Sequence, residues 1–373
     1  MGLSIPEFRI ESVKAVVLRA PIPVPVRTSF GTMRDRPAVF VRVDDDRGRH
    51  GYGEIWCNFP TVAAEHRKRL VDEIVGPALM EMKPDGKTAP FDRLMDRLHV
   101  LALQSGEWGP LRQVAAGLDA AVHDLAARRA GLPLFRYLNP AASGDIAVYA
   151  SGIGPETPGA TAERARKGGH AAFKVKVGFG RDTDLASLTA IRQAIGPHTR
   201  LMADANQGWT LEEAAARVAD YAAFDLTWIE EPLRADRPLR EWSDLAARSP
   251  IPIAAGENLN GRAEFDAMMQ SSALTFVQPD VAKWGGVSGC YDIAAAGAGC
   301  ETGYCPHFLG GGIGLAASAH LLAAEGGGGM LEIDVNPNPL RDEVAGAMLR
   351  PNDGRLCLPD RPGIGITPDE LFS

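Results

Sequence analysis

The hydrophobic pattern changes its period about a third of the way along the chain. Residues 13–19 and 38–43 are apolar runs rich in β-branched residues, and they predict two strands. From about residue 61 to 131 the pattern becomes helical, with apolar residues such as Val114 and Leu118 on one face. The opening third is therefore expected to form an α+β unit.

After about residue 145, short apolar strands alternate with alanine-rich helical stretches, which predicts parallel β/α units. The candidate strands are residues 146–150, 173–177, 201–203, 226–229, 251–254, 275–277, 303–305 and 330–333. Their number is the number that closes a (β/α)8 barrel. We therefore expect an α/β protein with three segments. An α+β capping unit spans residues 1–140, a (β/α)8-type, modified TIM barrel spans 141–340, and a tail at 341–373 returns to the capping unit.

An ionisable side chain follows each predicted barrel strand after the first, at roughly 25-residue intervals, about the length of one compact β/α unit. These side chains are Lys174 and Lys176, Asp204, Glu230, Glu257, Asp280, His307 and Glu332. The carboxyl ends of barrel strands meet at one mouth, where the active sites of such barrels lie. The sequence therefore predicts a cluster of these groups at the mouth.

Three carboxylates of this set, Asp204, Glu230 and Glu257, follow three successive strands. They could surround one hard divalent cation, and Mg²⁺ prefers oxygen ligands. Without a cation, clustered carboxylates would repel and raise one another's pKa. A magnesium site is thus predicted, whereas Glu231 points the other way by strand parity and is interpreted as structural.

The basic residues of the set suit proton transfer. Lys174 and Lys176 share one strand face, where each charge would lower the pKa of the other and make a neutral amine available as a base. Asp280 lies one strand before His307, and a carboxylate behind an imidazole fixes its tautomer for acid/base work. Glu332, across the barrel, is expected to present a protonated carboxyl to a substrate oxygen.

Composition excludes other classes of partner. The formal net charge is −8, from 39 Lys+Arg and 47 Asp+Glu, which argues against nucleic acid and anionic membranes. No apolar run approaches the ~20 residues that span a bilayer. Five scattered cysteines without a C-x-x-C pair are typical of reduced cytosolic thiols, so a cytoplasmic location is expected.

The glycine-rich segment 310–314 fits neither a dinucleotide fingerprint nor a P-loop, and is interpreted as a loop whose backbone approaches the ligand.

Taken together, these motifs resemble the enolase superfamily, and specifically its mandelate racemase-like branch (the mandelate racemase/muconate lactonizing enzyme family). The resemblance rests on residues 51–54, 120–125, 174–176, 204–209, 228–232, 256–258, 278–280, 305–307 and 331–332. It implies removal of the proton α to a carboxylate through an enediolate, for which this superfamily uses a Lys or His base with Mg²⁺.

The resemblance also implies a role for each matching residue. It implies that Asp204, Glu230 and Glu257 bind Mg²⁺, and that Lys176 is a base assisted by Lys174. It implies that His307 with Asp280 is the acid/base on the opposite face, and that Glu332 is an electrophilic hydrogen-bond donor. Ser151 and Asn206 are implied to contact the substrate carboxylate. The muconate-lactonizing-like branch carries a catalytic lysine near the position of Lys283. If the strand continued, its odd spacing from Asp280 would put Lys283 on the other strand face, so Lys283 is interpreted as structural.

Two reactions share the enediolate: dehydration of an acid sugar to a 2-keto-3-deoxy acid, and racemisation or epimerisation of an α-hydroxy acid. A muconate-lactonizing-like cycloisomerase and a catalytically silent binding barrel are further alternatives. The segment 27–36 is expected to cover the mouth, and Arg27 and Arg34 suit a polyhydroxy acid or a diacid. We therefore predict dehydration of a small-molecule carboxylate, an acid sugar. A homo-oligomer is expected as a separate prediction.

Overall fold

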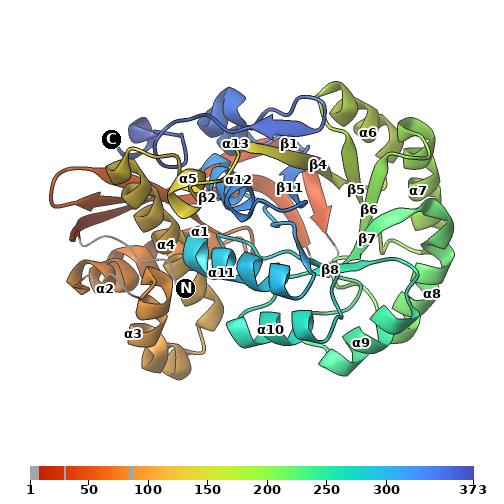
Figure 1. Cartoon of the computed structure of the whole chain (residues 1–373), viewed down its shortest axis with the longest axis horizontal. Helices are drawn as coiled ribbons and strands as arrows, with labels where there is room; N and C mark the ends of the chain where they lie inside the picture. The colour runs from red at the N-terminus through yellow and green to blue at the C-terminus, as the bar shows by residue number, and fades with distance from the viewer. Residues whose placement is uncertain (1–7, 29–30, 84–87) are drawn as a thin grey trace.

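The computed structural model describes residues 8–28, 31–83 and 88–373 of the 373-residue chain. A capping unit of antiparallel strands and helices lies beside a barrel of alternating strands and helices (Figure 1). Within the described residues, no helix is both long enough and apolar enough to cross a bilayer.

The capping unit contains a three-stranded antiparallel sheet in the order β1-β2-β3. Its strands are β1 (Ile10–Thr28), β2 (Gly31–Asp45) and β3 (His50–Ile55). The two predicted strands lie inside β1 and β2, which pair from one end to the other apart from two irregularities in register. Asp45 closes the turn between β2 and β3, because its Oδ1 accepts hydrogen bonds from the backbone N–H groups of Arg47 and Arg49.

The predicted helical stretch divides into several pieces. They are α1 (Ala63–Leu70), the π-helix η1 (Val71–Val75), α2 (Gly76–Glu81), α3 (Pro90–Ser105) and α4 (Trp108–Ala130), followed by α5 (Leu134–Leu138). Helix α4 packs directly on β3, because Gly51 and Gly53 carry no side chain there. A Cβ on Gly53 would lie 2.0 Å from the Gly117 carbonyl oxygen. The glycines of the Gly51–Glu54 motif therefore allow close strand–helix contact.

Eight parallel strands form a nearly closed barrel, which confirms the predicted fold. They are β4 (Asp145–Ile153), β5 (Ala172–Lys176), β6 (Arg200–Asp204), β7 (Leu226–Glu230), β8 (Ile253–Ala255), β9 (Phe276–Val277), β10 (Gly303–Tyr304) and β11 (Met330–Asp334). Hydrogen-bonded ladders join neighbouring strands from β10 round to β4 and then β11. Each predicted strand overlaps an observed one.

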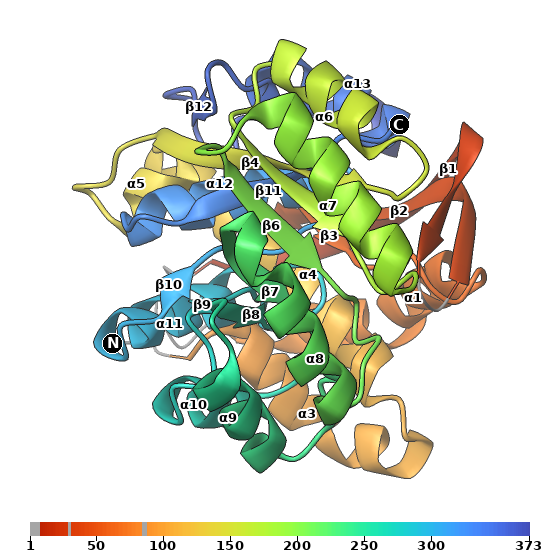
Figure 2. The same ribbon diagram turned by 90° about the vertical axis from the view of Figure 1, so that its right-hand side faces the viewer.

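Helices surround these strands, as Figures 1 and 2 show. They are α6 (Pro158–Lys167), α7 (Arg181–Ile195), α8 (Leu211–Tyr221) with the 3-10 turn η2 (Ala222–Phe224), α9 (Leu239–Arg248), α10 (Arg262–Gln270), α11 (Gly286–Gly299) and α12 (Gly312–Glu325). Helix α11 is fastened to α4 of the capping unit, because the buried Asp119 carboxylate accepts hydrogen bonds from the Ser288 N–H (2.9 Å) and hydroxyl (2.6 Å). The capping unit and the barrel are thus joined by buried polar contacts.

The barrel interior has an apolar layer below a polar layer. The apolar layer consists of Tyr149, Ala172, Met202, Trp228, Ala254, Cys305 and Met330. Because side chains two residues apart in a strand lie on the same face, the next inward position places Lys174, Asp204, Glu230, His307 and Glu332 above this layer. The apolar layer therefore supports the charged groups from below.

The tail runs back along the barrel toward the capping sheet. It contains α13 (Pro339–Ala345), η3 (Gly346–Leu349), β12 (Arg355–Cys357) and η4 (Asp369–Phe372). Strand β12 pairs antiparallel with β4. At the end of the chain, Tyr52 of β3 donates a hydrogen bond to Asp369, and the rings of Tyr52 and Phe372 lie 5.7 Å apart.

Candidate active site

The polar groups at the carboxyl ends of the barrel strands form one network around Lys174. This residue is 1% exposed, and its Nζ is 2.6 Å from Glu230 Oε1 and 2.8 Å from Glu332 Oε1. Asp204 Oδ2 is 3.8 Å from the same ammonium. Carboxylates from β6, β7 and β11 therefore share the buried ammonium group of Lys174.

The charges of this network set its pKa values. Burial lowers the pKa of Lys174, but the Glu230 and Glu332 carboxylates outweigh burial and hold it well above its usual value. Burial raises the pKa of Glu230 to about 7 despite the Lys174 ammonium. Burial also acts to raise the pKa of Glu332, but Lys174 and His307 bring it down to about 2. The direct Lys174 contact thus favours the ionised form of Glu332 in the metal-free chain, whereas the sequence predicts a protonated carboxyl.

Lys176 reaches the same network from the edge of the mouth. Its side chain is 25% exposed, and its Nζ donates hydrogen bonds to Asp204 Oδ2 and, at 3.0 Å, to Asn206 Oδ1. Burial lowers the pKa of Lys176, Asp204 raises it, Lys174 lowers it, and the net shift is upward. The sequence predicts that the Lys174–Lys176 pair lowers a lysine pKa. In the metal-free chain the pKa of Lys176 is raised instead, because the Asp204 carboxylate outweighs the Lys174 charge.

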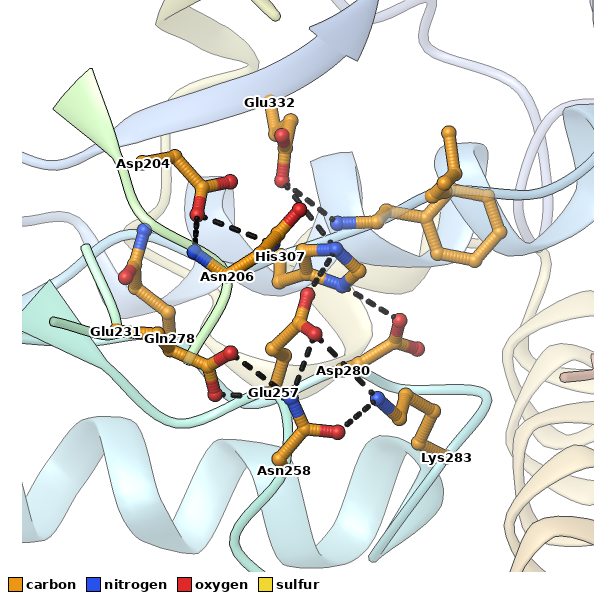
Figure 3. A network of polar contacts seen from close by, with 12 residues as sticks. Asp204, Asn206, Glu231, Glu257, Asn258, Gln278, Asp280, Lys283, His307 and Glu332 are labelled. Atoms are coloured by element: carbon orange, nitrogen blue, oxygen red, sulfur yellow. Dashed lines mark hydrogen bonds and ion pairs between the residues drawn. The ribbon is translucent and has the colours of Figure 1, made fainter. Parts of the chain in front are cut away.

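His307 contacts the other end of the carboxylate set. Its Nδ1 is 2.8 Å from Asp280 Oδ2, while its Nε2 contacts Glu257 Oε2 and lies 3.9 Å from Glu332 Oε2 (Figure 3). Asp280 is fixed in turn, because its Oδ1 accepts a hydrogen bond of 2.8 Å from the Ala282 N–H. Asp280 therefore orients one ring nitrogen and leaves the other facing the carboxylates.

We expect the His307 imidazole of the metal-free protein to titrate well above pH 6.5. Burial lowers the pKa of His307, but Glu257, Glu332 and the Asp280 hydrogen bond raise it well above its usual value. Such a group adds stability that is fully present below its unfolded pKa of about 6.5 and is lost as pH rises through the folded pKa. An NMR pH titration should show Asp280→Asn lowering the His307 pKa. An unchanged titration would contradict the role of Asp280.

Lys283 also lies in this network, because the strand does not continue as far as the parity argument requires. Strand β9 ends before Asp280, and the chain then turns, with the Lys283 N–H donating to the Asp280 carbonyl at 3.0 Å. Strand alternation therefore no longer applies. Lys283 Nζ donates to Asn258 Oδ1 at 2.8 Å, lies 3.7 Å from Glu257 Oε1, and stands 5.0 Å from the centre of the Trp56 ring.

Asn258 links Lys283 to two carboxylates. Its Nδ2 donates to both oxygens of Glu231 at 2.9 Å and to Glu257 Oε1 at 2.7 Å. Burial raises the pKa of Glu231 well above its usual value, and the Glu257 charge adds to this shift. Glu231 therefore supports the site from behind Glu257 rather than facing Lys174.

The remaining predicted substrate contacts have different positions. Ser151 is buried near the end of β4, beside Asp334 of β11, and Asn206 holds Asp204 Oδ1 through its N–H at 2.8 Å. Arg34 is an exposed residue of β2, and the side chain of Arg27 lies outside the described residues. Arg36 of the same segment was not among the predicted contacts, yet it is buried and pairs with Asp334 at 2.6 Å.

Two further residues of the site escaped the sequence reasoning. Tyr149 is buried, with its hydroxyl 3.5 Å from Lys174 Nζ, and Gln278 Nε2 donates to Glu230 Oε2 at 2.8 Å. Each has inward parity on its strand, Gln278 lying two residues after Phe276. Extending the i, i+2 rule to uncharged polar residues would have found both.

The donor set is one that Mg²⁺ prefers. Asp204, Glu230 and Glu257 supply carboxylate oxygens, and Asp204 and Glu230 are direct partners in the ladder between β6 and β7. Gln278 Oε1 is buried beside them and makes no hydrogen bond with the described residues. Among those residues, no three His, Cys, Asp or Glu side chains form a ready-made cage. Lys174, Lys176 and His307 contact these carboxylates instead, which neutralises their charge within the chain.

A barrel of this topology, with buried lysines, carboxylates and a histidine at its mouth, defines an enzyme site of the enolase type. Comparison with known families agrees. Residues 12–138 match "Mandelate racemase / muconate lactonizing enzyme, N-terminal domain", and residues 159–371 match "Enolase C-terminal domain-like". The chain belongs to the enolase superfamily, in its mandelate racemase-like branch.

Similar proteins are known across nearly the whole chain. D-galactarolactone cycloisomerase of Agrobacterium fabrum is 29% identical over 375 residues, covering 96% of each chain. A crystal structure described as mandelate racemase/muconate lactonizing enzyme from Bordetella bronchiseptica RB50 is 46% identical, with a TM-score of 0.90 and 98% coverage of both chains.

A third similar protein is L-talarate/galactarate dehydratase from Salmonella typhimurium LT2, crystallised with Mg and L-lyxarohydroxamate. It is 28% identical, with a TM-score of 0.84, and the match covers 97% of this chain and 91% of that one. Other relatives include an arabinonate dehydratase, an epimerase and a muconate cycloisomerase. The chain is thus a lyase or an isomerase of this superfamily.

Proposed function

We propose that the enzyme uses Mg²⁺ to remove the proton α to the carboxylate of an acid sugar and then expels the β-hydroxyl, giving a 2-keto-3-deoxy acid. One observation carries this proposal. The two candidate proton carriers contact opposite ends of the carboxylate set, Lys176 at Asp204 and His307 at Glu257. A substrate carboxylate held at this set would lie between a lysine and a histidine.

Asp204, Glu230 and Glu257 would hold the cation. When bound, Mg²⁺ supplies positive charge that stabilises the two negative charges of an enediolate. Lys174 is buried and held by Glu230 and Glu332, so it is suited to holding a substrate oxygen by charge. Asn206, which bridges Asp204 and Lys176, would orient the same substrate carboxylate.

The protein's own groups account for the remaining proton movements. Lys176, as the neutral amine, takes the α-proton, and the electron pair of the C–H bond enters the enediolate. His307, as the imidazolium favoured by Asp280, gives its Nε2 proton to the departing β-hydroxyl, which leaves as water. The resulting enol tautomerises to the 2-keto acid. His307 therefore begins in the form that its step requires. The Asp204 carboxylate raises the pKa of Lys176, so the neutral amine requires that this contact be relieved, as a cation held by Asp204 would do.

The choice of an acid sugar rests on the polarity of the mouth and on relatives. Arg36 is buried beside the mouth together with Asp334, which supplies charged and hydrogen-bonding groups for hydroxyls or a second carboxylate. The dehydratase of similar fold from Salmonella typhimurium carries a hydroxamate of a sugar acid. Both features favour a polyhydroxy acid over an aryl substrate.

A screen of mono- and diacid sugars with Mg²⁺ tests the proposal. We expect at least one acid to give a 2-keto product, detected with semicarbazide. In D2O this product should carry deuterium at C3, where tautomerisation of the enol adds a solvent proton. A library in which no acid gives a keto product, while an α-hydroxy acid exchanges its α-proton and racemises, would replace dehydration by racemisation. A lactone product from an unsaturated diacid would indicate a cycloisomerase.

A further inference from the structure

The glycine-rich segment that follows His307 packs against the capping unit. The sequence suggested that its backbone approaches a ligand, but the neighbouring group is Glu54 of β3. A Cβ on Gly310 would lie 2.6 Å from Glu54 Oε1, and a Cβ on Gly314 would lie 2.4 Å from the Phe308 ring. The glycines therefore make room for a carboxylate and a phenyl ring.

Glu54 caps the first turn of α12. Its Oε1 accepts the Gly311 N–H at 2.5 Å, and its Oε2 accepts the Gly314 N–H at 2.8 Å. The side chain is only 4% exposed. A helix N-terminus presents unpaired N–H groups and a partial positive charge, so a carboxylate there satisfies both. Burial raises the pKa of Glu54 to about 7, against these two hydrogen bonds. Because both of its oxygens accept a backbone N–H, the geometry fits the carboxylate form.

The loop between His307 and α12 has three other attachments. The Phe308 N–H donates to Glu332 Oε2 at 3.3 Å, and Asn58 of the capping unit donates from Nδ2 to the Leu309 carbonyl at 2.7 Å. Asn338 of the tail donates from Nδ2 to the Gly310 carbonyl at 2.8 Å. The capping unit therefore holds this loop through two residues, Glu54 and Asn58, while Glu332 and Asn338 hold it from the barrel and the tail.

We propose that Glu54 is a positioning residue for His307: by capping α12 from the capping sheet, it fixes the loop that holds the imidazole against Asp280 and Glu257. Lys176 lies on β5 and has no such attachment to this loop. The capping unit therefore acts on the histidine side of the site rather than the lysine side. This inference rests on the proposed role of His307 as the acid.

The variant Glu54→Gln tests the proposal at pH 8. Glutamine keeps the shape but has a single acceptor oxygen, so its NH2 group would face one of the two backbone N–H donors. We expect hydrogen exchange of the segment 308–314 to accelerate at least about tenfold, because a charged hydrogen-bond pair is lost. The ¹⁵N signals of His307, assigned with His307→Asn, should move or broaden.

The matched control is Glu325→Gln, at the far end of the same helix, where Glu325 Oε2 accepts the Gly327 N–H at 2.7 Å. It should leave segment 308–314 and the His307 signals unchanged. If Glu54→Gln fails to fold, Asn58→Ala is the second variant, because it removes the other contact between the capping unit and the loop. We expect Asn58→Ala to speed the hydrogen exchange of segment 308–314 and to move the His307 signals, each by less than Glu54→Gln. Protection and His307 signals like those of the wild type in both variants would overturn the proposal.

With an active acid sugar in hand, kinetics separate positioning from simple destabilisation. Glu54→Gln should lower kcat for dehydration at least about tenfold, with KM and α-proton exchange changed little, because the lysine side is intact. Equal losses of exchange and dehydration would contradict a selective effect on His307. Because hydrogen exchange and NMR need no substrate, a failure of the proposed reaction would leave the coupling of Glu54 to His307 testable.

Discussion

Replacing Lys176 with alanine is expected to lower the rate of α-proton exchange by about 10²- to 10⁴-fold, the usual contribution of a positioned acid or base. Asp204 would keep its hydrogen bonds from Asn206 and the nearby Lys174 charge, so the fold and the carboxylate set should survive. The measurement is deuterium incorporation from D2O, followed by NMR on a substrate from the acid-sugar screen.

The control for this variant is Lys167→Ala, an exposed lysine at the end of α6. It should exchange at the wild-type rate. The partner variant His307→Asn should lose dehydration while keeping α-proton exchange, because lysine removes the proton and histidine protonates the leaving hydroxyl. Full activity of Lys176→Ala on every competent substrate would show that another group is the base.

The second large effect is expected on stability. Replacing Lys174 with methionine leaves Glu230 and Glu332 buried without their shared cation. Removing one partner from a buried ion pair costs about 3–5 kcal/mol, because the remaining charge is uncompensated. Urea unfolding of the metal-free protein should show a loss of this size. Added Mg²⁺ should return part of it if the cation binds beside Glu230.

An exposed pair provides the comparison for Lys174. Lys68 and Asp72 form an ion pair one helical turn apart on the surface of the capping unit. Lys68→Met should cost less than about 1 kcal/mol, as is usual for such pairs. A loss for Lys174→Met no larger than that for Lys68→Met would mean that the buried carboxylates are neutralised in some other way.

The barrel was predictable because its strands are short, apolar and regularly spaced. Strand β8 is expected from residue 251 but begins at Ile253, after Pro252, which has no N–H to donate to a ladder. The positions of Asp204 and Glu230 followed from the same regularity, since each is the inward residue two positions after an apolar one.

Other parts of the site depend on contacts that spacing cannot reveal. Lys283 faces Asn258 because the chain turns after β9. Pro279 and Asp280 mark that turn in the sequence, but not the direction of the side chains after it. The lowered pKa of Glu332 and the raised pKa of Lys176 follow from which charges touch in the folded protein. Glu54 satisfies backbone amides that lie more than 250 residues away in sequence. Such pairings appear only when the two units are packed together.

Calorimetric titration with Mg²⁺ tests the central claim most directly, because the whole account requires three strand-end carboxylates to hold one cation. Wild-type protein should bind one Mg²⁺ per chain, and Asp204→Asn and Glu257→Gln should each abolish that binding while remaining folded. The account would be contradicted if the wild type bound no Mg²⁺, or if both variants bound it as tightly as the wild type.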